Sequence, residues 1–322
     1  MKEIMTLSEW LTKWFNLYSK PNIKQSTAVS YECYIRKHIS PVIGYLPIDK
    51  IDLDTLQAFF NIKSKELSPK SVYNIRMMLH NALKYAVLKN LIDKNYVEYV
   101  TIPKIIPPEM RVLTREEQKK LLESIASTDE PYAFGIFLCL TTGIRIGELC
   151  ALRWCDIDMS SEKLKIRHTL QRLMTLDDHN HKTQLFIGTP KSLASIRDIP
   201  LEENIIKAIK NHKKNMEARY GDCIISRTEY VITHRQEHPV EPKTMQKYFK
   251  KLIEKSGIEK ANFHSLRHTF ATRALEAGVD FKTLSVLLGH SDITVTMNRY
   301  AHVLEDTKRN AMNSIISVIL SQ

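Results

Sequence analysis

Apolar residues recur at helical spacing through the first third of the chain. The first stripe comprises Leu7, Trp10, Leu11, Trp14, Phe15 and Tyr18. Thr6 and Glu9 stand at the spacing of a capping box at its start, and both tryptophans are expected to pack between helices. Three further helices are predicted, at residues 27–43, 53–64 and 69–89. Because no strand pattern interrupts these segments, residues 1–99 are predicted to form an all-helical domain.

A proline-rich segment follows the predicted helical domain. Residues 100–112 read VTIPKIIPPEMRV, with Pro103, Pro107 and Pro108 close together. Proline removes a backbone donor and disrupts helices, so the segment is predicted to be an extended linker. We therefore expect the second domain to comprise residues 113–322.

The second domain mixes helical and strand patterns. Thr114 and Glu117 form another capping box, and a short helix is expected to carry Arg145. Other helices are predicted at 132–141, 202–219, 242–256, 265–277, 281–287 and 294–299. Alternating residues predict strands at 163–172, 184–190 and 195–200, with a short one at 230–233. The fold class is thus mainly α, with one small antiparallel sheet in the second domain.

The amino-acid composition limits the kinds of partner that the chain is expected to bind. The 322 residues contain 43% hydrophobic and 26% charged residues, as in ordinary globular proteins, and carry a formal net charge of +11. This charge indicates a polyanion, either nucleic acid or an anionic membrane surface. No apolar run approaches the ~20 residues of a membrane span, and no secretory signal is evident, so we expect a cytoplasmic protein with no membrane partner. The five scattered cysteines are expected to be reduced core residues: Cys33, Cys139, Cys150, Cys155 and Cys223.

Reactive side chains concentrate between residues 264 and 302, HSLRHTFATRALEAGVDFKTLSVLLGHSDITVTMNRYAH. His264 and Arg267 are three apart on a predicted helix and leave the same face. His290 follows a glycine, and Tyr300 comes ten residues later. This set suits a phosphate, because an arginine can fork two oxygens, imidazoles can donate to others, and a phenol can attack phosphorus.

Two upstream motifs complete the pattern. Residues 141–149, TTGIRIGEL, place Arg145 and Glu148 three apart, and residues 190–201, PKSLASIRDIPL, are predicted to form a hairpin arm carrying Lys191. With these motifs the chain resembles the tyrosine recombinases, the phage-integrase type of site-specific recombinase, most closely those of conjugative transposons and temperate phages. The residues that match the family's catalytic set in order are Arg145, Lys191, His264, Arg267, His290 and Tyr300.

The resemblance implies a metal-free and cofactor-free reaction. Tyr300 would attack a DNA phosphorus and form a 3′-phosphotyrosine, while Arg145 and Arg267 neutralise the non-bridging oxygens. Since a phenol with a pKa of ~10 is neutral at pH 7, it must lose its proton as it attacks, to a neighbouring histidine.

The remaining residues would support this step. Lys191 would protonate the leaving 5′ oxygen, and His264 and His290 would bind the phosphate and share proton transfer. Glu148 would orient a cation. Lys182 lies on the same predicted hairpin, and only the Ser-x-x-x-x-Arg-x-x-Pro context after Lys191 favours the latter.

Simpler interpretations exist for individual features. His264 and His268 have the spacing of a zinc-binding HExxH motif, but Ser265 replaces the glutamate. Residues 177–181, DDHNH, are expected to be a solvated turn rather than a metal site. A lone Arg-x-x-Glu is usually a surface pair. The joint occurrence of six reactive residues in the family's order outweighs these interpretations.

The resemblance also implies an assembly. The helical domain would grip double-stranded DNA, and four protomers would hold two duplexes in the bacterial nucleoid, with room for an accessory DNA-bending or directionality factor. An apolar stripe at the C-terminus, Met312, Ile315, Ile316, Ile319 and Leu320, predicts a helix. It could fold back or dock on a neighbour, and we favour the exchange between protomers. The additional arm-binding domain common in such integrases is not evident.

Two other functions fit the same residues. A type IB topoisomerase would use a similar set to relax supercoils and reseal the same strand. A non-catalytic protein on this scaffold would only occupy DNA. The non-catalytic protein is less favoured, because every reactive position is filled, and joined recombinant products would exclude the topoisomerase.

Overall fold

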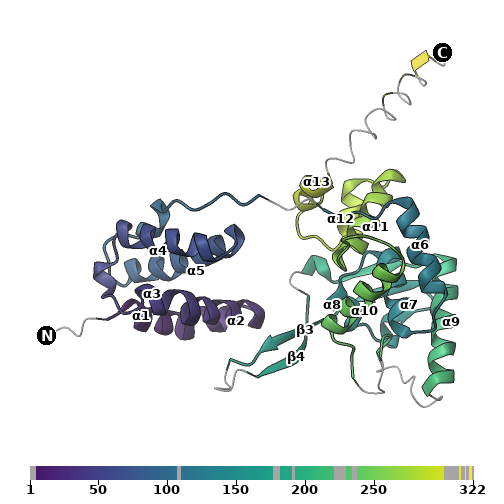
Figure 1. The fold of residues 1–322 in the computed structure, drawn as a ribbon, viewed down its shortest axis with the longest axis horizontal. Helices are drawn as coiled ribbons and strands as arrows, with labels where there is room; N and C mark the ends of the chain where they lie inside the picture. Colours follow the sequence, from purple (N-terminus) through teal and green to yellow (C-terminus); the bar gives the residue numbers. More distant parts are fainter. Residues whose placement is uncertain are drawn as a thin grey trace. The chain divides into compact units, whose positions relative to one another are not determined.

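The computed structural model describes residues 5–106, 110–176, 182–190, 193–220, 230–233 and 238–300, and positions 312, 316, 319 and 320 of the tail. The chain divides into two compact units (Figure 1). The first comprises Met1–Pro108 with Leu173–Gln184, and the second comprises Glu109–Arg172 with Leu185–Gln322. Each unit is described by itself below.

The first unit is built from the helices that the apolar pattern predicts. They are α1 (Leu7–Trp14), α2 (Gln25–Cys33), α3 (Ser40–Ile43), α4 (Leu53–Glu66) and α5 (Pro69–Leu88). The Thr6–Glu9 capping box is confirmed. Two π-helical segments, Phe15–Ser19 and Tyr34–Ile39, were not predicted, and the second joins α2 to α3 within the predicted helix 27–43.

The core of this unit confirms the packing role of the tryptophans. Trp10 and Trp14 are 2% and 3% exposed, and the indole nitrogen of Trp10 donates to the carbonyl of Ala82 at 3.0 Å. This bond satisfies the one polar atom of a buried ring and ties α1 to α5. Phe59 and Phe60 of α4 pack into the same core.

The second unit is mainly helical. Its helices are α6 (Arg115–Ala126), α7 (Pro131–Thr142), α8 (Ile146–Cys150), α9 (Glu203–Tyr220), α10 (Pro242–Lys255), α11 (His264–Glu276), α12 (Phe281–Leu288) and α13 (Ile293–Tyr300). The Thr114–Glu117 capping box of α6 is confirmed. Most of these helices share one core, whereas α11, α12 and α13 enclose a smaller one that includes Tyr300.

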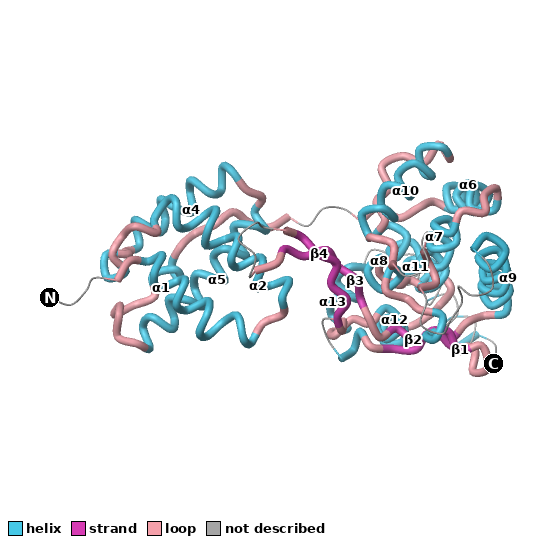
Figure 2. Tube along the Cα trace, turned by 90° about the horizontal axis from the view of Figure 1, so that it is seen from below, coloured by secondary structure: helices cyan, strands magenta, loops and turns pink. Residues whose placement is uncertain are grey.

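The strands correct the sequence prediction in two ways (Figure 2). The predicted strand 163–172 divides into β2 (Lys163–Ile166) and β3 (Thr169–Met174), which belong to different sheets. Consequently two small sheets form instead of one. The first has the order β1 (Ile157–Asp158), β2, β5 (Arg197–Pro200), with antiparallel pairing and Leu164 opposite Ile199.

The second sheet is the hairpin of β3 and β4 (Thr183–Gly188). The chain leaves the first sheet at Arg167, whose guanidinium turns aside to donate to the carbonyl of Arg197 at 3.0 Å. The strand predicted at 230–233 was wrong, because Tyr230 makes only an isolated bridge to Arg153.

The described cysteines are all free, but not all are core residues. Cys139 and Cys150 are buried, Cys33 is half-buried and Cys155 is exposed, which corrects the expectation for Cys155. Cys223 lies outside the described residues. Among the described helices, none has both the length and the apolar content needed to cross a membrane.

Candidate active site

Arg145 stands between two helices. α7 ends at Gly143, whose φ of 67° is the left-handed conformation that glycine tolerates best, and Arg145 then serves as N-cap of α8. Its backbone N–H donates to one carboxylate oxygen of Glu148 at 2.9 Å, and its guanidinium donates to the other at 2.7 Å. The predicted Arg-x-x-Glu pair is therefore a helix cap whose carboxylate is 3% exposed.

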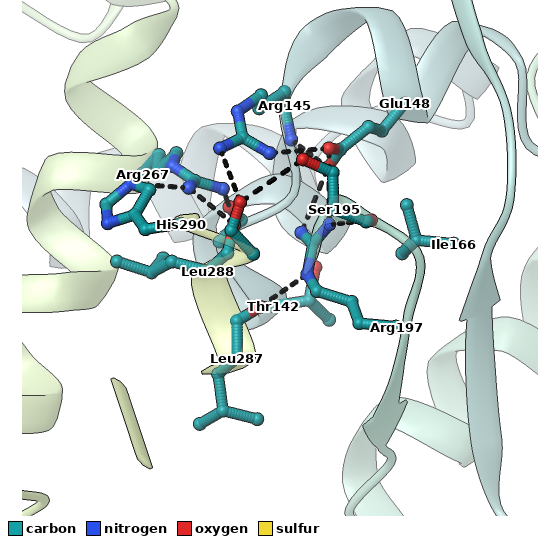
Figure 3. A network of polar contacts seen from close by, with 12 residues as sticks. Thr142, Arg145, Glu148, Ile166, Ser195, Arg197, Arg267, Leu287, Leu288 and His290 are labelled. Carbon is teal, nitrogen blue, oxygen red and sulfur yellow. Dashed lines mark hydrogen bonds and ion pairs between the residues drawn. The ribbon is translucent and has the colours of Figure 1, made fainter. Parts of the chain in front are cut away.

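Arg267, on α11, is almost fully buried at 2% exposure. Its guanidinium donates to the carbonyls of Gly143 at 2.7 Å and Leu288 at 2.6 Å, and lies 3.0 Å from Nε2 of His290. Arg145 donates to the carbonyl of Gly289, at 3.1 Å. The structure thus brings three distant motifs to one place (Figure 3).

A third guanidinium completes this site. Arg197, the first residue of β5, donates to both carboxylate oxygens of Glu148, at 3.2 and 2.9 Å. It also donates to the carbonyls of Leu287 at 2.6 Å and Ser195 at 3.0 Å. We call Arg145, Glu148, Arg197 and Arg267 the arginine cluster. Its three cations and one carboxylate leave two formal positive charges (3 − 1 = 2).

The electrostatics of the arginine cluster favour ionised groups. Burial alone would raise the pKa of Glu148, but the hydrogen bonds and charge of Arg197 and the charge of Arg145 hold that pKa below its usual value. Burial and neighbouring Arg145 lower the pKa of Arg267 to about 9, so it stays positive at neutral pH. A site with excess positive charge is suited to a phosphate.

The predicted histidines are neutral here. Burial and the nearby arginines lower the pKa of His264 to about 4 and that of His290 to about 3. Because an arginine can only donate, Nε2 of His290 accepts from Arg267, and Nδ1 carries the proton toward the hydroxyl of Thr296, 2.7 Å away. His264 is exposed, and its ring packs edge-on against that of His268 at 4.5 Å.

Tyr300 occupies a different environment. It is 1% exposed and packs with Ala271, Leu275, Leu284 and Leu288, which we call the tyrosine pocket. Its hydroxyl shares a hydrogen bond of 2.9 Å with Nδ1 of His268. Burial raises the pKa of the phenol, and the charges of Arg267 and Arg299 offset only part of this effect. The hydroxyl of Tyr300 is therefore paired with His268, and no hydrogen bond joins it to the described residues of the arginine cluster.

The two lysine candidates differ in what can be said of them. Lys191 lies outside the described residues. Lys182 is exposed beside the hairpin tip, where its carbonyl accepts from Thr175. A cleft of about 440 Å³ is lined by Arg145, Glu148, Thr169, Gln171, Pro190, Ser195, Gly289, His290, Ser291 and Val295. Pro190, which precedes Lys191, lines this cleft, whereas Lys182 is at the opposite end of β4.

The two metal motifs considered from the sequence have different outcomes. Residues 177–181 lie outside the described residues. His264 and His268 pack on each other through their rings. Within the described part of the chain, no three His, Cys, Asp or Glu side chains are grouped so that they could hold a metal ion.

Sequence reasoning missed three residues of the site. Arg197 has a recognisable signal, since it alternates with Ile199 on the buried face of β5, where a charged residue requires a partner. His268 was considered only as a metal ligand, although it is the polar partner of Tyr300. Thr296 is fully buried beside His290, and its helical spacing gives no signal of that contact.

Comparison with known proteins shows the same architecture elsewhere. A model described as the phage integrase family matches residues 111–307, and one for the phage integrase N-terminal SAM-like domain matches residues 6–64. The chain is 29% identical to a tyrosine recombinase XerC-like protein of Caldanaerobacter subterraneus, over 97% of this chain and 83% of the relative. It is 25% identical to the transposase of transposon Tn916 from Enterococcus faecalis, over 93% and 76%.

A solved structure extends the likeness to three dimensions. The Tn1549 transposon integrase in complex with a circular intermediate DNA has 26% identity and a TM-score of 0.77, covering 97% of this chain and 99% of that one. The likeness therefore spans both units.

Proposed function

The chain belongs to the phage integrase family and is a site-specific tyrosine recombinase, and we propose that it integrates and excises a mobile element with Tyr300 as its nucleophile. The observation that carries the assignment of the site is the arginine cluster. It places Arg145 and His290 on the wall of one cleft, with the guanidinium of Arg267 beside the imidazole of His290 and a net positive charge on the cluster. Relatives of transposon origin support the mobile-element role.

The scissile phosphate would enter the cleft next to Arg145. This guanidinium is 34% exposed, whereas Arg267 is committed to backbone carbonyls. Arg145 would therefore contact a non-bridging oxygen directly, and Arg267 would contribute its charge and hold His290. Fixed cations stabilise the charge that develops on these oxygens during attack. His264 would complete the contacts with its one N–H, and His290 would do so once its Nδ1–H is released from Thr296.

Strand cleavage then requires α13 to move. The phenol of Tyr300 leaves the tyrosine pocket and its oxygen bonds to phosphorus, while the bond from phosphorus to the 5′ oxygen breaks. The phenolic proton passes to a neutral imidazole, and the 5′ oxygen gains a proton from the general acid. The depressed pKa values of His264 and His268, both about 4, keep these imidazoles neutral at pH 7, so each has one unprotonated nitrogen. Reversal with a new 5′ hydroxyl joins the recombinant strands.

Lys191 is the general acid that we favour. Its neighbour Pro190 lines the cleft. Lys182 is separated from Gly188 by the whole of β4, six residues or roughly 20 Å of strand. An ammonium next to the cleft wall could reach the leaving oxygen.

Double-stranded DNA is the proposed partner, and the protein would work in the bacterial cytoplasm. The net charge of +11 agrees with a phosphate backbone. Four protomers on two duplexes would exchange their tails, with an accessory DNA-bending or directionality factor where the element requires one. Four apolar tail residues, Met312, Ile316, Ile319 and Leu320, are 46–76% exposed, which supports docking on a neighbour. Ile315 lies outside the described residues.

The experiment begins by sequencing the DNA junctions that the protein makes in cells. The recovered junction is then synthesised as a duplex with a nick next to the crossover, so that cleavage traps the protein. We expect a covalent protein–DNA adduct that Tyr300→Phe abolishes and that the matched control Tyr248→Phe retains, in the presence of EDTA. Joined recombinant strands are expected with two intact duplexes.

Each rival function has its own outcome in this assay. Binding without an adduct would indicate a non-catalytic protein. An adduct that reseals only to its original strand, with relaxation of supercoiled plasmid, would indicate a topoisomerase. An adduct that persists in Tyr300→Phe would remove Tyr300 from the reaction.

A further inference from the structure

Arg197 has no assigned role, yet its side chain makes more hydrogen bonds than that of either other arginine of the arginine cluster. Its side chain is 3% exposed and donates to Glu148, Leu287 and Ser195 at 2.6–3.2 Å. These contacts link β5 to α8 and α12, three segments separated by 49 and 90 positions in the sequence. A buried cation needs a counter-charge, which Glu148 supplies, but the same carboxylate also pairs with Arg145, and this sharing calls for an explanation.

Glu148 is placed where it can interfere with phosphate binding. One of its oxygens accepts from Nη1 of Arg145 at 2.7 Å, and the carboxylate is almost fully buried. In so little solvent, a single carboxylate paired with Arg145 alone would cancel most of that arginine's charge. A phosphate would then meet a neutral ion pair rather than a cation.

Arg197 removes this conflict. It donates to both oxygens of Glu148, which also accept from Arg145 (Figure 3). Fork-to-carboxylate pairing of this kind is the geometry in which arginine binds a carboxylate most strongly. Arg197 is also shielded from the cleft, because its side chain is 3% exposed, and two further N–H groups donate to the carbonyls of Leu287 and Ser195. The positive charge of Arg197 is therefore compensated within the protein, while the side chain of Arg145 remains 34% exposed.

We propose that Arg197 is a positioning residue that neutralises Glu148 and so leaves the charge of Arg145 available to the scissile phosphate. Glu148 orients Arg145, and Arg197 balances Glu148. The proposal rests on the proposed function, because it assumes that Arg145 contacts the phosphate.

The close packing of Arg197 against the backbone of Gly289 leaves no room for a side chain at position 289. A Cβ on Gly289 would lie 3.0 Å from both Cδ and Nη1 of Arg197, and the residue has a φ of 66°. The same glycine accepts through its carbonyl from Arg145. Close approach of the arginine side chain to this backbone therefore requires glycine, which couples the Leu-Gly-His segment to the position of Arg197.

The test uses variants that change the charge or the shape of the side chains at positions 197 and 148. Single-turnover cleavage of the junction substrate described above is measured with protein in excess. We expect Arg197→Met to cleave about 100-fold more slowly than the wild type, as for loss of one stabilising donor, with DNA affinity changed less than about threefold. Adding Glu148→Gln to that variant should restore at least about tenfold, because the uncompensated carboxylate is gone. Arg197→Lys should lie within about tenfold of the wild type, because it keeps the charge.

A chemically altered phosphate supplies the second readout. A methylphosphonate at the scissile position carries no negative charge, so it needs the free charge of Arg145 far less. We expect the difference between wild type and Arg197→Met to shrink below about tenfold on this substrate. A 5′-thiolate leaving group should not reduce the difference, because the general acid is not affected. Arg167→Met is the matched control. Arg167 forms an ion pair with Asp198, the neighbour of Arg197 in β5, but its side chain is 35% exposed.

Thermal unfolding of every variant separates folding from chemistry. If folded Arg197→Met and its double variant are equally slow, or equally impaired on both phosphates, Arg197 is structural only and the inference is wrong. Rescue by the 5′-thiolate would likewise overturn it, since Arg197 would then act through the general acid. If Arg145→Met cleaves as fast as the wild type, it is instead the proposed function that has the wrong site.

Discussion

The arginine cluster and the tyrosine pocket lie in the same unit but differ in how accessible their reactive groups are. In the arginine cluster, each guanidinium and the carboxylate of Glu148 have partners at hydrogen-bonding distance, and a cleft gives access to Arg145. In the tyrosine pocket, the phenol of Tyr300 is 1% exposed and bonds to His268. The groups that we propose to bind phosphate are assembled, whereas the proposed nucleophile is buried.

This difference has a physical reason. Fixed cations lose nothing by being assembled early, because their reorganisation during the reaction would cost free energy. A nucleophile held ready at every bound phosphate would instead break DNA whenever the protein binds. Because α13 carries both Tyr300 and Thr296, its movement would release the phenol and the partner of His290 together. Binding and cleavage are thereby separate steps.

The largest expected effect concerns the general acid, which has not been placed in either region. Lys191→Ala should slow cleavage about 100- to 10,000-fold with little change in DNA binding, because the 5′ oxygen would leave without a proton. A 5′-thiolate, which leaves without protonation, should recover most of the rate. Single-turnover cleavage of both substrates measures this, with Lys182→Ala as the control. Rescue of Lys182→Ala instead would assign the acid to the hairpin tip.

The next effect separates the two arginines by their burial. Arg267→Met would leave the carbonyls of Gly143 and Leu288 without their donor, so we expect a loss of about 2–5 kcal/mol in the free energy of unfolding. Arg145→Met should cost about 1 kcal/mol or less, because its side chain is partly exposed and Glu148 keeps Arg197. Urea denaturation measures both. Equal losses in the free energy of unfolding would mean that the two arginines do not differ in their contribution to stability.

Predictability from sequence follows the same division. The helical first unit was predictable because its stability comes from one apolar face per helix, and residues such as Leu7, Leu11 and Ile75 report that face directly. The caps at Thr6 and Thr114 were predictable because capping is local. The π-helical segments were not, since tertiary packing decides them.

The site was predictable only as a set of residues. Motif order identified Arg145, Arg267 and His290, but not that Gly143 and Gly289 supply the carbonyls that hold the two arginines. Those contacts join positions 144 and 124 apart in the chain, so no local pattern reports them. The burial of Tyr300 was not predicted either, because its segment has no feature that separates a resting nucleophile from an active one.

A smaller effect tests what holds the phenol in its pocket. His268→Phe keeps a ring there but leaves the hydroxyl of Tyr300 unpaired, at a cost of about 1–2 kcal/mol to the closed state. Nitration of Tyr300 without DNA, followed by mass spectrometry, should therefore be about 5- to 30-fold faster. Thr272→Val is the matched control, because this buried hydroxyl on the same helix has no hydrogen-bond partner. An unchanged rate would show that apolar packing alone retains the tyrosine.

The smallest effect is a pH dependence of stability. Burial lowers the pKa values of His264, His268 and His212 to about 4, and that of His290 to about 3, all below the ordinary value near 6.5. Between those values the unfolded chain binds more protons, so stability falls as pH decreases from 7.5 to 5.5. The loss at pH 5.5 should be about 1 kcal/mol for His212, which is 6% exposed, and less for His264, whose exposed side chain is screened by water.

DNA binding should change only the contribution of the site histidines to the pH dependence of stability. A bound phosphate favours protonated imidazoles at His264 and His290, whereas His212 stacks on Phe134 at 4.0 Å and is not among the residues lining the cleft. The rise in melting temperature caused by the junction duplex should therefore be larger at pH 5.5 than at pH 7.5, by a few degrees, in both the wild type and His212→Gln. If the rise is the same at both pH values, the phosphate does not bind beside the histidines, and the arginine cluster is not where DNA is cut.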